Sequence, residues 1–297
     1  MQKIKLTILT PTYNREHLLP RVFASLQTQT VKDFEWLVID DGSTDNTEEY
    51  MQSLPMVDFS VRYYRKENGG KHTALNYSHR YIRGESVLIL DSDDYLTPET
   101  VETILNDWQK YAGMSNVAVL SYEKGEKNGK IISERADMPD YYLSDDIHFR
   151  VNHCVHGDRA EVVRTEVFKN FSLPTHNNEK FMSEGWLWNN IAKRYQTVYI
   201  QKVIYICEYL DMGLTRSGRI LRMHSPLNMM EACKSFFYSE VCLKIQLKEM
   251  LLFCVYGLCS KLPVYKWVIN SGRPIQTALI LPLGWVLFKY WKSRYSF

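Results

Sequence analysis

The chain has 297 residues, of which 45% are hydrophobic and 24% are charged, so it can bury a substantial core in one large or two smaller domains. Its 36 lysines and arginines nearly balance its 34 aspartates and glutamates, and this near-neutral charge gives no reason to expect a nucleic-acid partner. No secretory signal precedes the first predicted strand, and six cysteines without a CxxC pair indicate reduced thiols in a cytoplasmic protein.

Short apolar runs alternate with helical patterns along the first part of the chain. Strands are predicted over residues 5–10, 36–39, 59–64, 86–90 and 117–122, and helices over 18–29, 44–54, 73–81 and from Pro98 onward. This alternation predicts an α/β fold in which helices cover both faces of a mostly parallel sheet. No linker rich in proline, serine or glycine divides the chain, so we expect one continuous globule whose halves share a cleft.

Two acidic clusters follow two of the predicted strands. The first is Asp40-Asp41-Gly42-Ser43-Thr44-Asp45 and the second is Asp91-Ser92-Asp93-Asp94. Carboxylates at the carboxyl ends of strands face the crevice in which open α/β sheets bind ligands. The Asp-x-Asp of the second cluster can offer two oxygen donors to a divalent cation, which can in turn hold a diphosphate. The clusters therefore favour an enzyme that uses a nucleotide-sugar.

Three ordered motifs resemble those of the family 2 glycosyltransferases with the GT-A fold. They are Thr10-Pro11-Thr12-Tyr13-Asn14-Arg15, Asp40-Asp41-Gly42-Ser43 and Asp91-Ser92-Asp93-Asp94. Their spacing agrees with the family over roughly residues 1–125, a match more specific than a lone Asp-x-Asp. The resemblance implies a GT-A (Rossmann-like) sheet and an inverting transfer of sugar from a nucleoside diphosphate to an acceptor hydroxyl.

The donor base is expected at the end of the first strand. Pro11, Thr12 and Tyr13 leave the strand at the ligand edge, where backbone groups and the Tyr13 ring can receive a base. Following the resemblance, Asp41 accepts the imide N–H of uracil, which favours a UDP-sugar, while Asp40 braces the loop. A half-buried tyrosine and ordinary Asp-Gly-Ser turn chemistry are the alternatives.

The second cluster is expected to bind the metal. Asp93 is the predicted direct ligand of Mn²⁺ or Mg²⁺, and Asp91 reaches the ribose, the metal or a metal-bound water, with Ser92 between them in the donor site. Lys71 follows two glycines at a helix start, where backbone amides attract anions, so Lys71 and His72 can contact the diphosphate or the sugar. The glycines alone also mark an ordinary turn.

The catalytic base is expected in the second half of the chain. The resemblance implies an acid upstream of Leu-Trp at a helix start, and counting back from Leu187-Trp188 places Glu184 there. The family's Glu-Asp pair is absent, so the alternative is that Ser183 caps the helix and Glu184 only favours its start. Asp158 is the second candidate for the base or for acceptor binding.

The tail predicts either packed helices or an interfacial anchor. The uncharged run 274–288 precedes a basic, aromatic fringe but falls short of the roughly 20 apolar residues that span a membrane. We divide the chain into a nucleotide-sugar-binding half (1–120), an acceptor-binding half (121–225) and a C-terminal helical region (226–297). The expected acceptor is a growing glycan or a lipid-linked saccharide, with the protein peripheral on the cytoplasmic face of the inner membrane.

Two other functions fit parts of the sequence. A catalytically silent nucleotide-sugar-binding subunit is an alternative, because Glu184 stands alone where the family has a Glu-Asp pair. A nucleotidyltransferase also uses carboxylates and metal, but Thr10-Pro11-Thr12-Tyr13 stands where its glycine-rich basic loop would follow the first strand. A dehydrogenase is disfavoured because no G-x-G-x-x-G follows that strand.

Overall fold

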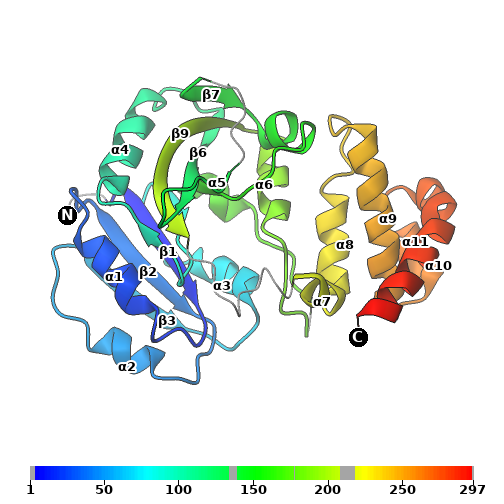
Figure 1. Ribbon diagram of the computed structural model, residues 1–297, viewed down its shortest axis with the longest axis horizontal. Helices are drawn as coiled ribbons and strands as arrows, with labels where there is room; N and C mark the ends of the chain where they lie inside the picture. Colours follow the sequence, from blue (N-terminus) through cyan, green and yellow to red (C-terminus); the bar gives the residue numbers. More distant parts are fainter. Residues whose placement is uncertain (1–3, 134–138, 177, 208–217, 296–297) are drawn as a thin grey trace.

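The computed structural model describes residues 4–133, 139–176, 178–207 and 218–295, which build a mixed sheet flanked by helices (Figure 1). The nine-stranded sheet of the described chain has the order β3-β2-β1-β4-β8-β6-β9-β5, with β7 beside β9. The strands are β1 (Leu6–Thr12), β2 (Phe34–Asp40), β3 (Ser60–Arg65), β4 (Ser86–Ile89), β5 (Tyr95–Leu96), β6 (Val117–Glu126), β7 (Tyr141–Ser144), β8 (Arg159–Arg164) and β9 (Gln196–Cys207).

The first four long strands run parallel, as the alternating sequence pattern predicts. In β1, Leu6 pairs with Phe34 of β2 and with Ser86 of β4. The carboxyl ends of these strands therefore meet at one edge of the sheet. Strand β8 is antiparallel to β4, so it begins at the edge where β4 ends. Residues from the first and second halves of the chain are thereby brought to the same edge.

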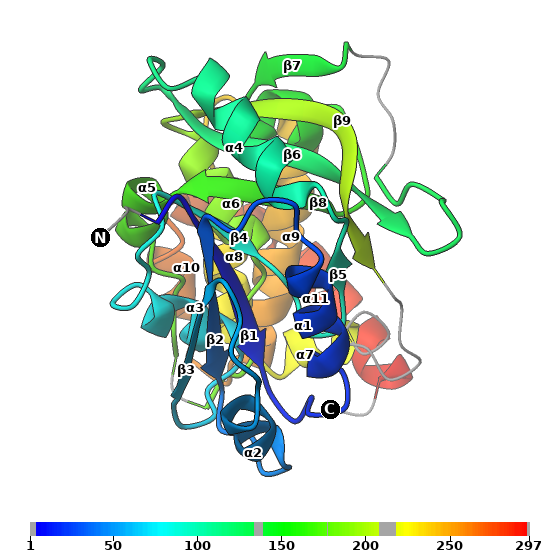
Figure 2. The same cartoon turned by 90° about the vertical axis from the view of Figure 1, so that its left-hand side faces the viewer.

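Helices cover both faces of the sheet (Figures 1 and 2). Successive strand residues point to opposite faces; Ile8 packs in the cluster that includes residues of α1 and α4, and Leu9 packs in the cluster that includes residues of α3, α5 and α6. This two-sided burial explains the uninterrupted apolar runs of the central strands. The helices are α1 (Leu19–Gln27), α2 (Thr47–Gln52), α3 (Lys71–Ser78), α4 (Thr100–Lys110), η1 (Ile147–Val151), α5 (Thr165–Asn170) and α6 (Gly185–Ala192).

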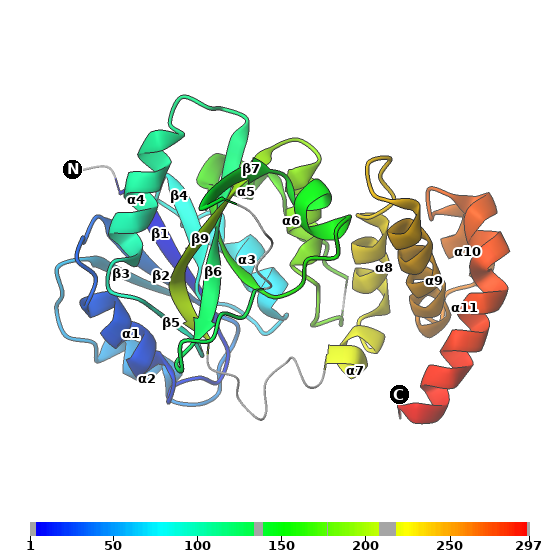
Figure 3. The same ribbon diagram turned by 45° about the horizontal axis from the view of Figure 1, so that its top comes forward.

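The C-terminal helices form a bundle beside the sheet domain. They are α7 (Gly218–Met223), α8 (Pro226–Lys234), α9 (Leu243–Cys259), α10 (Val264–Ile269) and α11 (Pro274–Arg294), and α9 lies between α8 and α11 (Figure 3). Gly284 allows α11 to approach α9 closely, because a Cβ there would lie 2.5 Å from the Cβ of Cys254. None of the described helices is long and apolar enough to cross a membrane.

Some predicted boundaries move. The helix expected from Pro98 begins at Thr100, and Pro282 lies inside α11 without ending it. After β6 the chain turns back, and Gly125 and Ile131 form an isolated antiparallel bridge. The sheet runs without a break across residue 120, while the proposed division at 120 and 225 stays a prediction.

Candidate active site

The loops after β1 and β2 are fastened together at the carboxyl edge of the sheet. Asn14, with a φ of +52°, donates its backbone N–H to Ser43 Oγ at 2.9 Å, and its Oδ1 accepts the Thr44 N–H at 2.7 Å. Pro11 and Thr12 are buried, whereas the Tyr13 side chain is 46% exposed. Of the three residues predicted to receive a base, Tyr13 is therefore the one whose ring is open to a ligand.

Asp40 braces the loop that follows β2, as the sequence predicts. Its Oδ1 accepts the Ser43 N–H at 2.8 Å, and its Oδ2 accepts the Tyr63 hydroxyl at 2.6 Å. Burial and the Asp40 carboxylate raise the pKa of Tyr63, so the phenol stays protonated and keeps donating. Asp40 is completely buried and is thus a structural residue of this turn.

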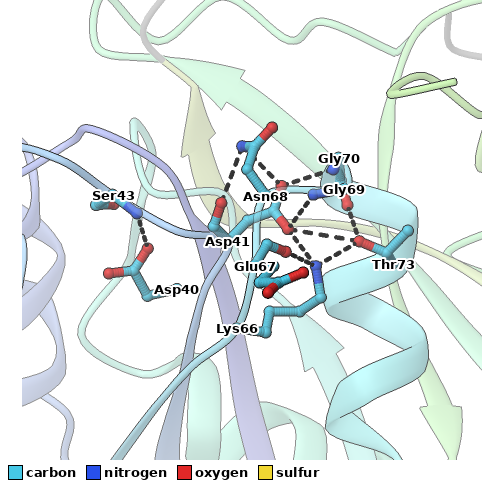
Figure 4. Close-up of polar contacts among 9 residues, drawn as sticks. All are labelled: Asp40, Asp41, Ser43, Lys66, Glu67, Asn68, Gly69, Gly70 and Thr73. Carbon is cyan, nitrogen blue, oxygen red and sulfur yellow. Dashed lines mark hydrogen bonds and ion pairs between the residues drawn. The ribbon is translucent and has the colours of Figure 1, made fainter. Parts of the chain in front are cut away.

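The neighbouring Asp41 holds residues 66–73, named here the glycine loop (Figure 4). Its Oδ1 accepts from Lys66 Nζ at 2.6 Å and from the Gly69 N–H at 3.0 Å. Its Oδ2 accepts from the Gly70 N–H at 2.6 Å and from Asn68 Nδ2 at 3.2 Å. Both oxygens are engaged by the protein in this arrangement, so the uracil contact expected of Asp41 stays a prediction and an additional structural role is evident.

The glycine loop also packs closely against the segment that carries Glu184. Gly70 has a φ of +94°, and a Cβ at this position would lie 2.0 Å from the carbonyl oxygen of Lys180. A residue earlier, Glu179 accepts the backbone N–H groups of Leu227 at 2.8 Å and of Asn228 at 2.6 Å, at the start of α8. Residues 179–184 are therefore fixed between the glycine loop and the C-terminal helices.

Lys71 joins the predicted catalytic base, Glu184, to Asp91, which is predicted to bind the donor and the metal. Its Nζ lies 2.6 Å from Glu184 Oε1 and also contacts Asp91. Burial tends to lower the pKa of Lys71, but the two carboxylates outweigh this effect and raise it, so the ammonium is charged. Burial likewise tends to raise the pKa of Asp91, but Lys71 and Lys124 hold it below its usual value. Three residues singled out by sequence thus converge in space.

Glu184 occupies the N-cap position of α6, yet its side chain makes no capping hydrogen bond. The carboxylate instead reaches Lys71, which favours a role in the site over the alternative in which it merely supports the helix start. Asp158, the other candidate base, is exposed and directly precedes β8 at the same sheet edge. Of these two acids, Glu184 is the one in contact with Lys71 in the described part of the chain.

The second acidic cluster concentrates negative charge. Asp91 and Asp93 are half-buried, Ser92 and Asp94 are buried, and the Asp93 carbonyl accepts a hydrogen bond from Arg21. Burial, followed by the charges of Asp91 and Asp93, raises the pKa of Asp94 to about 7. This crowding of carboxyls indicates a place where a cation is favourable.

The donor set of this cluster fits a divalent cation only in part. The described residues contain no group of three or more histidine, cysteine, aspartate or glutamate side chains arranged to hold a metal. One or two carboxylates, completed by phosphate oxygens of a substrate, are however the usual protein contribution to a Mg²⁺ site. Asp91 and Asp93 match that pattern, so the cation would need the diphosphate to complete its ligands.

Several contacts were not foreseen from the sequence. Tyr205 of β9 accepts the Asp91 N–H at 2.9 Å, and Lys124 of β6 lies 4.2 Å from the Tyr205 ring centroid. Neither residue belongs to a recognisable motif. The contact of Lys66 with Asp41 was also not foreseen. The sequence signal that could have pointed to Lys66 is its position three residues before the pair Gly69-Gly70. His72, expected near the diphosphate, is buried instead, and burial lowers its pKa to about 4.

A cavity opens beside this network. It is a hollow largely open to solvent, with a volume of about 580 Å³, and it is lined by Gly42, Arg65, Lys66, Glu67 and Asn68. Arg65 is held there by donating to the Ser43 carbonyl at 2.6 Å. The cavity thus lies between the Asp40-Asp41 turn and the glycine loop, with two cationic side chains in its wall.

Comparison with known proteins shows the family of the chain. The profile described as "Glycosyl transferase family 2" matches residues 7–169, more than half of the chain. A Campylobacter jejuni protein named GalNAc(5)-diNAcBac-PP-undecaprenol beta-1,3-glucosyltransferase is 27% identical over 214 residues, which cover 68% of this chain and 64% of that protein. For other curated relatives, 33–35% identical, the chain spans only 14–22% of their length.

Two solved structures share the fold. S. aureus TarS 1–349 in complex with UDP-GlcNAc superposes with a TM-score of 0.67 at 18% identity, covering 92% of this chain and 81% of that one. The mannosyltransferase PcManGT from Pyrobaculum calidifontis, in complex with GDP-Man and Mn²⁺, gives a TM-score of 0.57 at 16% identity, covering 96% and 87%. At these identities the likeness concerns the fold alone, and it confirms the predicted GT-A architecture.

Proposed function

The chain belongs to glycosyl transferase family 2, and from this premise we propose that it moves a sugar from a nucleoside diphosphate donor to an acceptor hydroxyl. The observation that carries the proposal is the contact of Lys71 with both Asp91 and Glu184 at the carboxyl edge of the sheet. It joins the acidic cluster suited to a donor diphosphate to the carboxylate suited to an acceptor hydroxyl.

The donor we propose is a UDP-sugar. The 580 Å³ cavity lies next to Asp41, and the exposed Tyr13 ring stands at the end of the neighbouring strand. Together they offer a volume, a stacking face and hydrogen-bonding groups for a uridine. For Asp41 to accept the uracil imide N–H, one of its carboxylate oxygens must share or exchange a contact now made by the glycine loop.

We assign the cation, Mn²⁺ or Mg²⁺, to Asp93 and Asp91, with Ser92 positioned between them. Oxygen donors of this kind suit either ion, and a bound cation would offset the charge that develops on the departing diphosphate. Arg21 holds the Asp93 backbone in place, and Tyr205 holds that of Asp91. These two contacts hold the backbone from which the two carboxylates extend.

Glu184 is the general base in this proposal. It takes the proton of the acceptor hydroxyl while that oxygen attacks the anomeric carbon, and the bond from this carbon to the diphosphate oxygen breaks with its electrons. Attack from the face opposite the leaving group inverts the anomeric centre. Lys71, 2.6 Å from Glu184, orients the carboxylate. Asp158, at the same edge, is placed as an acceptor-binding residue.

The acceptor we propose is a glycan or a lipid-linked saccharide, met by a protein peripheral on the cytoplasmic face of the membrane. The Campylobacter relative is named for an undecaprenol-linked saccharide, which supports this class of acceptor. The half-buried Trp186 and Trp188 at the start of α6 lie near the proposed base. Aromatic side chains of this kind can pack on the apolar face of a sugar.

UDP binding measured by calorimetry, with and without Mn²⁺, tests the donor site. We expect Mn²⁺-dependent binding by the wild type and its loss in Asp93→Ala. Asp58→Ala is the matched control, because Asp58 is an exposed aspartate whose side chain is 67% accessible. Binding that is absent in the wild type, or retained by Asp93→Ala, would contradict the assignment.

The released product separates the alternatives. A glycosyltransferase releases a nucleoside diphosphate, whereas a nucleotidyltransferase releases pyrophosphate. A silent binding subunit would bind UDP without releasing it from any UDP-sugar, including by slow hydrolysis. We expect release of UDP, detected by a coupled enzymatic assay.

A further inference from the structure

The outer side of α10 and α11 is apolar although it faces away from the protein. On α11, Ile275, Leu279, Leu283 and Val286 are 74%, 75%, 65% and 60% exposed. On a helix that advances about 100° per residue, these positions lie on the side opposite Gly284 and Trp291, which pack on α9. A helix that is apolar on its exposed side as well as on its buried side is expected to bury the exposed side against another apolar surface.

The short helix α10 repeats this arrangement. Trp267 is buried against Gly257 of α9, whereas Tyr265 and Ile269, about half a turn away, are 63% and 64% exposed. Both helices therefore turn one side to α9 and the opposite, apolar side outward, at the end of the molecule far from α1 and α2 (Figures 1 and 3). We call these exposed residues of α10 and α11 the outer face.

Charge around the outer face is of one sign. Residues 250–297 contain no aspartate or glutamate, but they contain six basic residues: Lys261, Lys266, Arg273, Lys289, Lys292 and Arg294. With 36 basic and 34 acidic residues in the chain, residues 1–249 keep 30 and 34, and so carry four more acids than bases. The surplus of positive over negative charge thus lies in residues 250–297, the segment that carries the outer face, and it matches an anionic surface.

Aromatic side chains stand among these groups. Trp285 and Tyr290 are about half exposed, and Lys289 Nζ lies 5.2 Å from the Trp285 ring centroid. Tryptophan and tyrosine beside lysine are typical of the boundary between lipid headgroups and acyl chains. An apolar helix side flanked by cations is the pattern of helices that lie in the plane of a bilayer surface.

We propose that the outer face docks on an anionic lipid bilayer, with the apolar side chains of α10 and α11 inserted below the headgroups. The choice of a membrane agrees with the lipid-linked acceptor and to that extent rests on the proposed function. The surface itself is defined without reference to the donor site. A second copy of the chain is the competing occupant.

Sedimentation with vesicles, in the absence of donor and acceptor, tests the docking. The wild type should bind vesicles of phosphatidylcholine containing about a third phosphatidylglycerol more tightly than phosphatidylcholine alone, and less tightly at high salt. Leu279→Asp combined with Leu283→Asp should weaken this binding by roughly ten-fold or more. Met56→Asp, at a fully exposed methionine outside the outer face, should leave it unchanged.

Two further measurements keep the outcomes distinct. Both variants should retain wild-type circular dichroism and UDP binding, so a failure of the donor site and a failure of the docking are read separately. Equal vesicle binding by wild type and the double variant would overturn the proposal. So would a wild-type dimer in sedimentation velocity that becomes monomeric in the double variant while neither protein binds vesicles.

Discussion

Asp41 and Asp91 each follow a parallel strand, yet they are used differently. Asp41 is buried, and the hydrogen bonds that its side chain accepts all come from the glycine loop, two of them from backbone amides. Asp91 is half-buried, and its partners come from three distant segments: Lys71, Tyr205 and, through its charge, Lys124. Asp41 thus holds one loop, whereas Asp91 is surrounded by separate elements: its carboxylate contacts Lys71 and its backbone N–H donates to Tyr205. This arrangement suits the donor-site role proposed for Asp91.

The largest expected effect tests the chemical side of this comparison. Glu184→Gln should lower kcat by about 10³, because general base catalysis contributes 10²–10⁴, and should leave UDP affinity nearly unchanged. Steady-state kinetics and calorimetry measure the two effects. Glu99→Gln, at a glutamate whose side chain is 68% accessible, is the matched control. If Asp158→Asn abolishes transfer and Glu184→Gln does not, the two acids have exchanged roles.

The next effect tests the structural side. Gly70→Ala should destabilise the fold or displace the glycine loop, because its Cβ would overlap the Lys180 carbonyl oxygen at 2.0 Å. Gly129→Ala is the control, since Gly129 also has a positive φ of +86° but no atom within 4 Å of the added carbon. Gly70 has a ψ of 158°, a conformation found almost only for glycine, and backbone strain there is worth about 1–3 kcal/mol. We expect a larger loss for Gly70→Ala, measured by chemical denaturation, together with a raised donor KM; equal losses would show that the contact with Lys180 is unimportant.

Removal of the Lys71 ammonium, which Asp91 and Glu184 share, should have a smaller effect. Lys71→Met should raise the donor KM by about ten-fold, as expected for the loss of one buried charged contact. Lys71 holds the pKa of Asp91 low, so its removal should let Asp91 take up a proton at higher pH. The acid limb of the kcat/KM profile should then move to higher pH. Lys110→Met, at a lysine whose side chain is 52% accessible, should show neither change.

The last effect concerns stability rather than catalysis, at the acid next to the pair Asp91 and Asp93. The pKa of Asp94 is raised from 3.8 to about 7, so the folded state holds this proton more tightly than the unfolded state. Its stabilising contribution is complete below pH 4 and is lost as the pH rises to about 7. As the pH rises from 4 to 7, the free energy of unfolding of the wild type should therefore fall by about 1–3 kcal/mol more than that of Asp94→Asn.

Urea titrations at several pH values measure that difference. Glu161, whose pKa burial also raises to about 7, is still present in the variant, so part of the pH dependence should remain. Parallel curves for wild type and Asp94→Asn would contradict the role given to Asp94.

The sequence predicted well those features that depend on local pattern. The parallel strands up to β4 and the acidic turns at their ends follow from short-range periodicity and turn chemistry, and the bracing role of Asp40 follows from the family resemblance. The family resemblance implies Glu184 through its distance from Leu187-Trp188, and in the structure this side chain contacts Lys71. The proposed roles of these side chains stay predictions until they are measured.

Features that depend on long-range register were not predictable. Tyr205 meets Asp91 across 114 residues because β9 pairs with both β5 and β6, and no motif marks that pairing. The Asp41–Lys66 contact depends on the path of the glycine loop, which local propensity does not determine. Periodicity also could not decide which side of α11 is exposed, because the helix is apolar all round.

The hydrogen bonds from α8 to Glu179 bear on how this protein can be shortened or recombined. A chain cut before Pro226 would lose the two amides that hold Glu179, and Glu184 is only five residues further along the same segment. Exchange of the tail with that of a relative should therefore keep α8 and also α9, because Cys242 before α9 donates its backbone N–H to Asn152 at 2.7 Å and Phe253 of α9 packs in the same core as α8. The part of the chain that must be kept thus extends well beyond the end of the sheet.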